Sequence, residues 1–267
     1  MRCALISSPR SRKNRRDLEL AARVLGVMPR GSSLFFARTL EEMDRAASTC
    51  QARGLRCVYL LGGDGTHRVA LDALVQAYSE VQLPRLVFLR GGTINTIAAG
   101  LGIPRRSPEF LAARAARGGA RAVAQPLLRV DDAAGPHYGF LFGTGAICNF
   151  LVEHLRTEHP TPIHSSATLA KTLPEATGLR QKKILARQRV SLCVDSKPGP
   201  RRDVLCIAAG TIEHMGMGFR PFRSVRGAQG AFGGALVVWS RGRRSPNAVG
   251  LALGEKHVCG YGGPVSL

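Results

Sequence analysis

Short apolar runs alternate with segments of helical spacing through the first part of the chain. The apolar runs are Cys3–Ser7, Leu34–Ala37, Cys57–Leu61 and Leu86–Leu89, and the helical segments include Leu18–Leu25, Thr39–Arg53 and Val69–Tyr78. Strands separated by helices of this size form βαβ units around a parallel sheet. The sequence therefore predicts an α/β protein whose N-terminal part is a three-layer domain built on a parallel sheet.

The pattern changes near residue 125. Short β-like runs follow, at Leu127–Val130, Tyr138–Phe142, Val190–Val194, Val204–Ala209 and Ala235–Trp239, with one helical insert at Gly145–Arg187. We expect a nucleotide-binding domain over residues 1–125 and a β-rich, sandwich-like domain over residues 126–267.

The amino-acid composition limits the kinds of partner that this protein is expected to bind. The chain has 267 residues, of which 45% are hydrophobic, so it can bury a core. It has 38 basic and 18 acidic residues, a formal charge of +20, which favours anionic partners such as nucleotides or an acidic membrane surface. Aromatic residues do not interleave with the basic ones, so we expect no nucleic-acid binding. The composition predicts no oligomeric state.

The cysteines and the hydropathy indicate a reducing compartment. The 7 cysteines include no C-x-x-C pair and several lie inside apolar runs, which favours free thiols. The N-terminus lacks the order of a signal peptide, and the longest uncharged stretch, Ala133–Val152, is too polar to span a bilayer. We expect a cytoplasmic protein that can dock on the inner membrane surface.

The motif with the clearest chemistry is Leu60–Thr66, a strand that runs into the turn Gly62-Gly63-Asp64-Gly65-Thr66. Glycines let the backbone approach a ligand, and the free N–H groups of the following helix favour phosphate. Asp64 could orient the loop, bind a ribose hydroxyl or help to hold Mg²⁺. A plain Asp-Gly turn is the alternative. No Gly-Lys-Ser/Thr follows, so this is not a Walker loop.

A second small-residue turn, Gly91–Asn95, follows the next strand. Ligands of parallel sheets bind beyond the C-terminal ends of the strands. Both turns should therefore open onto one crevice. The predicted nucleotide-binding residues are Thr39, Gly62, Gly63, Asp64, Gly65, Thr66, Gly92, Thr93 and Asn95.

These segments resemble the diacylglycerol kinase catalytic superfamily, which includes bacterial lipid kinases and sphingosine kinases. The family pattern is matched in order by Ser8–Arg12, Thr39, Gly62–Thr66 and Gly92–Thr96. The resemblance implies an ATP- and Mg²⁺-dependent kinase that phosphorylates a hydroxyl of diacylglycerol or a related lipid. Asp64 would then organise the loop or a Mg²⁺–phosphate unit.

The chain departs from the family pattern at several positions, and its part beyond Trp239 is short for this family. Arg68 and Val69 replace an Asn–Glu pair, Thr96 replaces an Asp, and Arg12 replaces a glycine. The late Asp-Gly-Glu motif is represented only by Leu253–Glu255, so Glu255 is the candidate general base, with Glu213 second. No set of metal ligands is predicted. The alternatives are a catalytically deficient nucleotide- or lipid-binding protein and a soluble-substrate kinase similar to NAD kinases.

Overall fold

The computed structural model falls into two compact units. It describes residues 2–79, 82–132, 134–155, 184–190, 193–194, 197–198, 202–215, 220, 222, 233–238, 247–251 and 264–266. The first unit comprises Met1–Phe140, His214–Arg220 and Cys259–Leu267, and the second comprises Leu141–Glu213 and Pro221–Val258. The units thus divide the chain at other positions than residue 125, and the two-domain assignment made from the sequence stays a prediction.

A parallel sheet forms the centre of the first unit. Its first strands are β1 (Ala4–Ser7), β2 (Ser33–Phe36), β3 (Cys57–Gly62) and β4 (Arg85–Arg90), which pair in parallel in the order β2-β1-β3-β4. Every residue of β1 and β3 is buried. This explains the unbroken apolar runs in the sequence, because a parallel sheet is covered on both faces.

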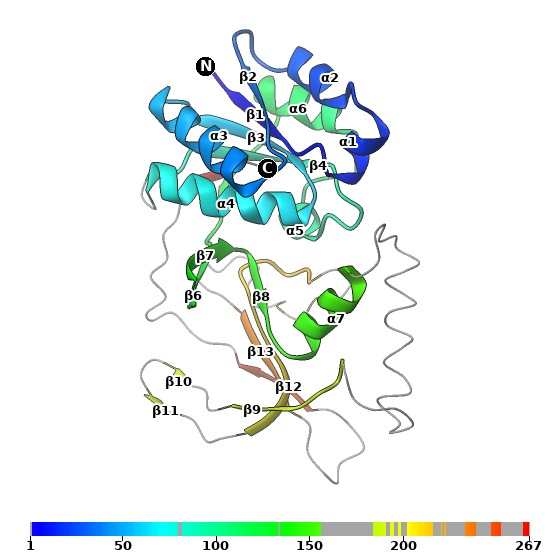
Figure 1. The fold of residues 1–267 in the computed structure, drawn as a ribbon, viewed down its shortest axis with the longest axis vertical. Coiled ribbons are helices and arrows are strands. Elements are labelled where there is room, and N and C mark those ends of the chain that lie inside the picture. The colour runs from blue at the N-terminus through cyan, green and yellow to red at the C-terminus, as the bar shows by residue number, and fades with distance from the viewer. Residues whose placement is uncertain are drawn as a thin grey trace. The chain divides into compact units, whose positions relative to one another are not determined.

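Helices cover both faces of this sheet, as Figure 1 shows. On one side lie α3 (Leu40–Ala52) and α4 (Asp64–Tyr78), and on the other lie α1 (Arg12–Arg16), α2 (Leu20–Gly26) and α6 (Pro108–Ala116). The short helix α5 (Thr96–Gly100) contacts α4 and β4. The predicted three-layer α/β architecture is confirmed.

Segments distant in sequence complete the first unit. Strand β15 (Pro264–Ser266) pairs in parallel with β4 and antiparallel with β5 (Ala122–Ala124). The sequence did not predict this return of the chain to the first sheet. A hairpin of β6 (Leu128–Asp132) and β7 (Gly135–Gly139) is attached to α4, because Asp72 accepts a hydrogen bond from the backbone N–H of Tyr138 at 2.6 Å.

The second unit is rich in strands, as the sequence predicts, and its described strands pair antiparallel. Strand β12 (Arg202–Gly210) pairs with β8 (Leu141–Gly143), β9 (Gln188–Val190) and β13 (Gly233–Val238), and β13 pairs with β14 (Asn247–Leu251). Strands β10 (Cys193–Val194) and β11 (Lys197–Pro198) form a separate pair. Within β12 every second residue from Val204 is buried, the alternation of a sheet with one covered face.

Helix α7 (Ala146–Leu155) follows β8 and contacts β12. A glycine permits this junction. Gly145 has φ +64°, and a Cβ there would lie 2.4 Å from the carbonyl oxygen of Leu205. Of the predicted helical insert, only Gly145–Leu155 and residues from Ile184 onward lie within the described part of the chain. No helix among the described residues is both long and apolar enough to cross a bilayer.

Candidate functional site

The C-terminal ends of β1, β3 and β4 meet at one edge of the sheet, and backbone hydrogen bonds join the turns that follow them. Gly91 N–H donates to the carbonyl of Gly62 at 2.7 Å, and Lys13 N–H donates to the carbonyl of Gly91 at 3.0 Å. Ser8 N–H donates to the carbonyl of Leu61 at 3.1 Å. The three turns therefore form one continuous surface of backbone.

The turns after β3 and β4 contact each other through glycine. A Cβ on Gly92 would lie 2.6 Å from the Cα of Gly63, and a Cβ on Gly63 would lie 3.0 Å from the Cα of Gly92. A Cβ on Gly62 would lie 2.4 Å from the Cβ of Thr66. Only residues without a side chain allow this approach, so the spacing of the glycines in the sequence has a steric cause.

Asp64 connects the same turns through its carboxylate. Oδ2 accepts the backbone N–H of Thr96 and Oδ1 accepts that of Ile97, each at 2.9 Å. Asp64 begins α4 but satisfies free N–H groups at the start of α5. Three roles were considered for Asp64 from the sequence, and these hydrogen bonds correspond to the first of them, orientation of the loop.

Asn95 closes the second turn on itself. Its Oδ1 accepts the N–H of Gly92 and its Nδ2 donates to the carbonyl of Gly92, both at 2.9 Å. The residue is buried and has φ +54°, a left-handed conformation that asparagine tolerates better than most residues. Thr93, inside the closed turn, is only half-buried. Asn95 therefore supports the turn, while Thr93 is within reach of a ligand.

The N-terminus of α4 has no side-chain cap. Its N-cap residue is Gly63, and within the described part of the chain no side-chain cap hydrogen bond is made there. Gly65, in that turn, is exposed, and a Cβ built on it would meet nothing within 4 Å. Uncapped N–H groups at the positive end of a helix dipole attract anions, above all phosphate.

Basic side chains add to this positive end. Burial lowers the pKa of Lys13, and the neighbouring Arg90 contributes to the decrease while Glu109 opposes it. Arg90 is buried, and its Nε and Nη2 donate to the carbonyl of Ile103. Burial, and then the charge of Arg105, lower the pKa of Arg90. Lys13 and Arg90 thus bring positive charge beside Gly91, and the carboxylates of Glu109 and Asp64 offset part of it.

The other predicted site residues are Thr39, Glu255 and Glu213. Thr39 is exposed and caps α3, where its hydroxyl accepts the N–H of Glu42 at 3.2 Å. The carboxylate of Glu42 accepts the N–H of Arg38, the residue before this cap. Glu255 lies outside the described residues. Glu213 follows β12 and is half-buried.

Sequence reasoning did not single out Lys13 and Arg90. Lys13 lies in the basic segment after the Ser8–Arg12 turn, where one lysine among arginines gives no signal. Arg90 ends an apolar strand, directly before Gly91, and a charge in such a position could have indicated a site. Within the described residues no group of three or more His, Cys, Asp or Glu side chains is placed to hold a metal ion.

Comparison with known proteins agrees with the family resemblance of the glycine turns. The sequence profile of the diacylglycerol kinase catalytic domain matches residues 5–125. No curated protein matches the sequence. A crystal structure named as a "putative diacylglycerol kinase" from Bacillus anthracis str. Sterne is similar in fold, with a TM-score of 0.63, 13% identity, and coverage of 89% of this chain and 75% of that one.

A diacylglycerol kinase structure from the same organism has a TM-score of 0.61 and 16% identity, and the match covers 89% of this chain and 73% of that one. At such identities the structural likeness concerns the fold alone. The resemblance drawn from the glycine turns is confirmed by the profile match, which contains both of them.

Proposed function

We propose that this chain, whose residues 5–125 match the diacylglycerol kinase catalytic domain, is an ATP-dependent kinase that phosphorylates a hydroxyl of diacylglycerol or a related lipid alcohol. The observation that carries the proposal is the contact between Gly63 and Gly92 beside the uncapped start of α4. Together these features offer backbone N–H groups, open space and positive charge at one place.

The phosphates of the nucleotide would lie over Gly62–Thr66 and Thr93, and Thr39 and Asn95 would border the crevice. ATP supplies the phosphoryl group that is transferred. The chain would orient the phosphates with the N–H groups of α4 and would balance their charge with Lys13 and Arg90. Transfer of this kind depends on positioning and electrostatics more than on covalent chemistry.

Asp64 would act through the loops. Its hydrogen bonds to Thr96 and Ile97 keep the turns after β3 and β4 in register. The described donor set fits Mg²⁺ only as part of a nucleotide–metal complex, in which phosphate oxygens and water provide most of the ligands. Asp64 is the carboxylate of the turn that could complete such a set.

The acceptor would be a lipid alcohol. The β-rich residues 126–267 would supply an apolar surface for its acyl chains, and Glu255 would take the hydroxyl proton as general base. Basic side chains would favour an anionic bilayer by about 1 kcal/mol for each residue near the surface. The protein would thus work at the cytoplasmic surface of the membrane.

The test is transfer of phosphate from labelled ATP to diacylglycerol in mixed micelles. We expect Asp64→Ala to reduce the rate by at least about tenfold, because two N–H groups lose their acceptor and the turns lose their register. Asp44→Ala, which removes an exposed carboxylate from α3, is the matched control and should transfer at the wild-type rate.

Other outcomes separate the alternatives. Equal, nonzero rates for wild type and Asp64→Ala would refute the site assignment. Nucleotide binding without transfer to any lipid would indicate a catalytically deficient member of the family. Phosphorylation of NAD in the absence of lipid and detergent would identify a soluble-substrate kinase instead.

A further inference from the structure

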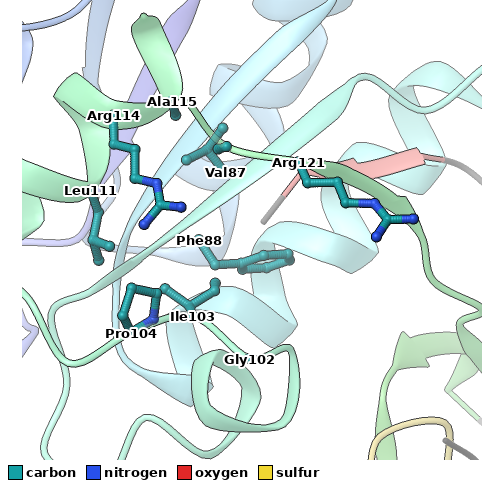
Figure 2. Close-up of a pocket in the computed structure, with 10 residues that line it drawn as sticks. Val87, Phe88, Gly102, Ile103, Pro104, Leu111, Arg114, Ala115 and Arg121 are labelled. Carbon is teal, nitrogen blue, oxygen red and sulfur yellow. The ribbon is translucent and has the colours of Figure 1, made fainter. Parts of the chain in front are cut away.

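A pocket of about 340 Å³ lies in the first unit, away from the glycine turns (Figure 2). It is formed by β4, α6, the segment that follows α5 and the residues before β5. The residues that matter below are Val87, Phe88, Ile103, Leu111, Arg114 and Arg121. None of the residues that line it belongs to Gly62–Thr66 or Gly91–Asn95.

We propose that this pocket binds a single-chain amphiphile with an anionic head, such as a medium-chain fatty carboxylate. The alkyl chain would fill the pocket and the carboxylate would pair with Arg121, while Arg114, on the other side of the apolar side chains, would add to the positive charge. The pocket is lined by none of the residues of the two glycine turns, so this binding does not require the proposed kinase reaction.

The inner wall is apolar. Val87 and Phe88 come from β4 and Leu111 from α6, and all are buried. Ile103 completes this wall from the segment after α5. An alkyl chain placed among these side chains would remove its own surface from water, at a gain of about fourfold in affinity for each buried methylene.

Two arginines also line the pocket. Arg114 and Arg121 are exposed, and Figure 2 shows their guanidinium groups on either side of the apolar side chains. Arg114 Nε donates to the carbonyl of Gly119 at 2.9 Å, which holds the side chain in place. Neither arginine has a carboxylate partner among the described residues. Two cations beside an apolar pocket complement a carboxylate attached to an alkyl chain.

The wall is preformed. Ile103 N–H donates to the carbonyl of Ala98 at 2.9 Å, and the Ile103 carbonyl accepts from Arg90. Helix α6 is fixed at its start by Ser107, whose hydroxyl accepts the N–H of Phe110 at 3.2 Å. A site with ordered walls loses little entropy when it is filled.

The volume of the pocket favours a ligand with a single alkyl chain. Small-molecule sites span roughly 300–1,000 Å³, and this pocket lies at the low end of that range. A lipid with two acyl chains needs more room. A single alkyl chain suits this volume.

The test is isothermal titration of the full chain with dodecanoate below its micellar concentration, without nucleotide or lipid substrate. We expect saturable binding of one dodecanoate per chain and weaker binding of the uncharged dodecanol. Arg121→Gln should weaken dodecanoate binding by about fivefold, the value of an exposed ion pair. Ala115→Phe, which places a ring in the pocket, should abolish it.

Arg117→Gln is the matched control, because it removes a positive charge from the end of the same helix without altering the pocket lining. It should bind dodecanoate as the wild type does. If Arg117→Gln and Arg121→Gln weaken dodecanoate binding equally, the anion responds only to the net charge of the protein, and the proposal is overturned. Unchanged binding by a folded Ala115→Phe protein would also overturn it. If Ala115→Phe does not fold, the comparison of the two arginine variants decides the question.

Discussion

Helices α3 and α4 both follow strands of the same parallel sheet, yet their N-termini are built differently. Thr39 caps α3 with its own hydroxyl. Helix α4 begins with Gly63 and Asp64, has no side-chain cap, and gives its carboxylate to α5 instead. Helix α6, capped by Ser107, resembles α3 in this respect.

This difference implies that the N-terminus of α3 contributes to stability, whereas we propose that the N-terminus of α4 serves ligand binding. A cap satisfies the free N–H groups of a helix and stabilises it by about 1 kcal/mol. Helix α4 has no such cap, and its turn is instead stabilised by contact between Gly63 and Gly92 and by the hydrogen bonds of Asp64. Substitutions in the two regions should therefore have different consequences.

The largest effect is expected at the contact between the glycine turns. Gly92→Val would place a Cβ 2.6 Å from the Cα of Gly63, so one turn has to move. We expect the free energy of unfolding to fall by about 3 kcal/mol, the upper range for overpacking, together with loss of nucleotide binding. Urea unfolding followed by circular dichroism measures the first effect. A wild-type unfolding midpoint would show that the turns are not in contact.

A smaller effect is expected from pH, and it is specific to α4. His67 on this helix is fully buried, with its ring 5.0 Å from that of Phe88, and burial lowers its pKa. Below about pH 6.5 the unfolded chain binds a proton that the folded chain rejects. Stability should therefore fall as the pH decreases from about 6.5, by up to about 1.4 kcal/mol per pH unit.

His67→Leu removes this contribution. Urea unfolding of wild type and variant at a series of pH values should give curves that diverge toward acid, with the wild type losing more stability. Parallel curves would mean that the imidazole is accessible to protons in the folded chain.

The smallest effect is expected at a capped helix. Ser107→Ala removes the acceptor for Phe110 N–H, and we expect the free energy of unfolding to fall by about 1 kcal/mol. Because this cap is not part of the glycine turns, the affinity for nucleotide should stay at the wild-type value in a calorimetric titration. A large loss of nucleotide affinity in Ser107→Ala would contradict the distinction between helices that have a side-chain cap and helix α4, which lacks one.

The sequence predicted most of the first unit because its signals are local. The apolar runs at β1, β3 and β4 are buried strands, and Thr39 and Glu42 mark the start of α3. The glycine turns could be placed at one sheet edge because parallel strands end together.

Other features depend on tertiary contacts. Nothing near Asp64 in the sequence indicates that its carboxylate caps a helix that starts at Thr96. The pairing of β15 with β4 joins the end of the chain to its first part, and a strand of three residues carries no periodic signal. Lys13 and Arg90, far apart in the sequence, are neighbours in the fold, where Lys13 N–H donates to the carbonyl of Gly91.

The central claim is that the open N-terminus of α4 receives the phosphates of a nucleotide. Gly65→Ala tests it, because a Cβ on Gly65 meets nothing within 4 Å in the protein but points toward the free N–H groups of the helix. Gly26→Ala, at an equally open glycine on α2, is the matched control.

The measurement is calorimetric titration of both variants with a non-hydrolysable ATP analogue. We predict that Gly26→Ala binds as the wild type does. Gly65→Ala should fold normally and bind at least about tenfold more weakly, a loss of about 1.4 kcal/mol. Wild-type affinity in a folded Gly65→Ala protein would contradict the claim.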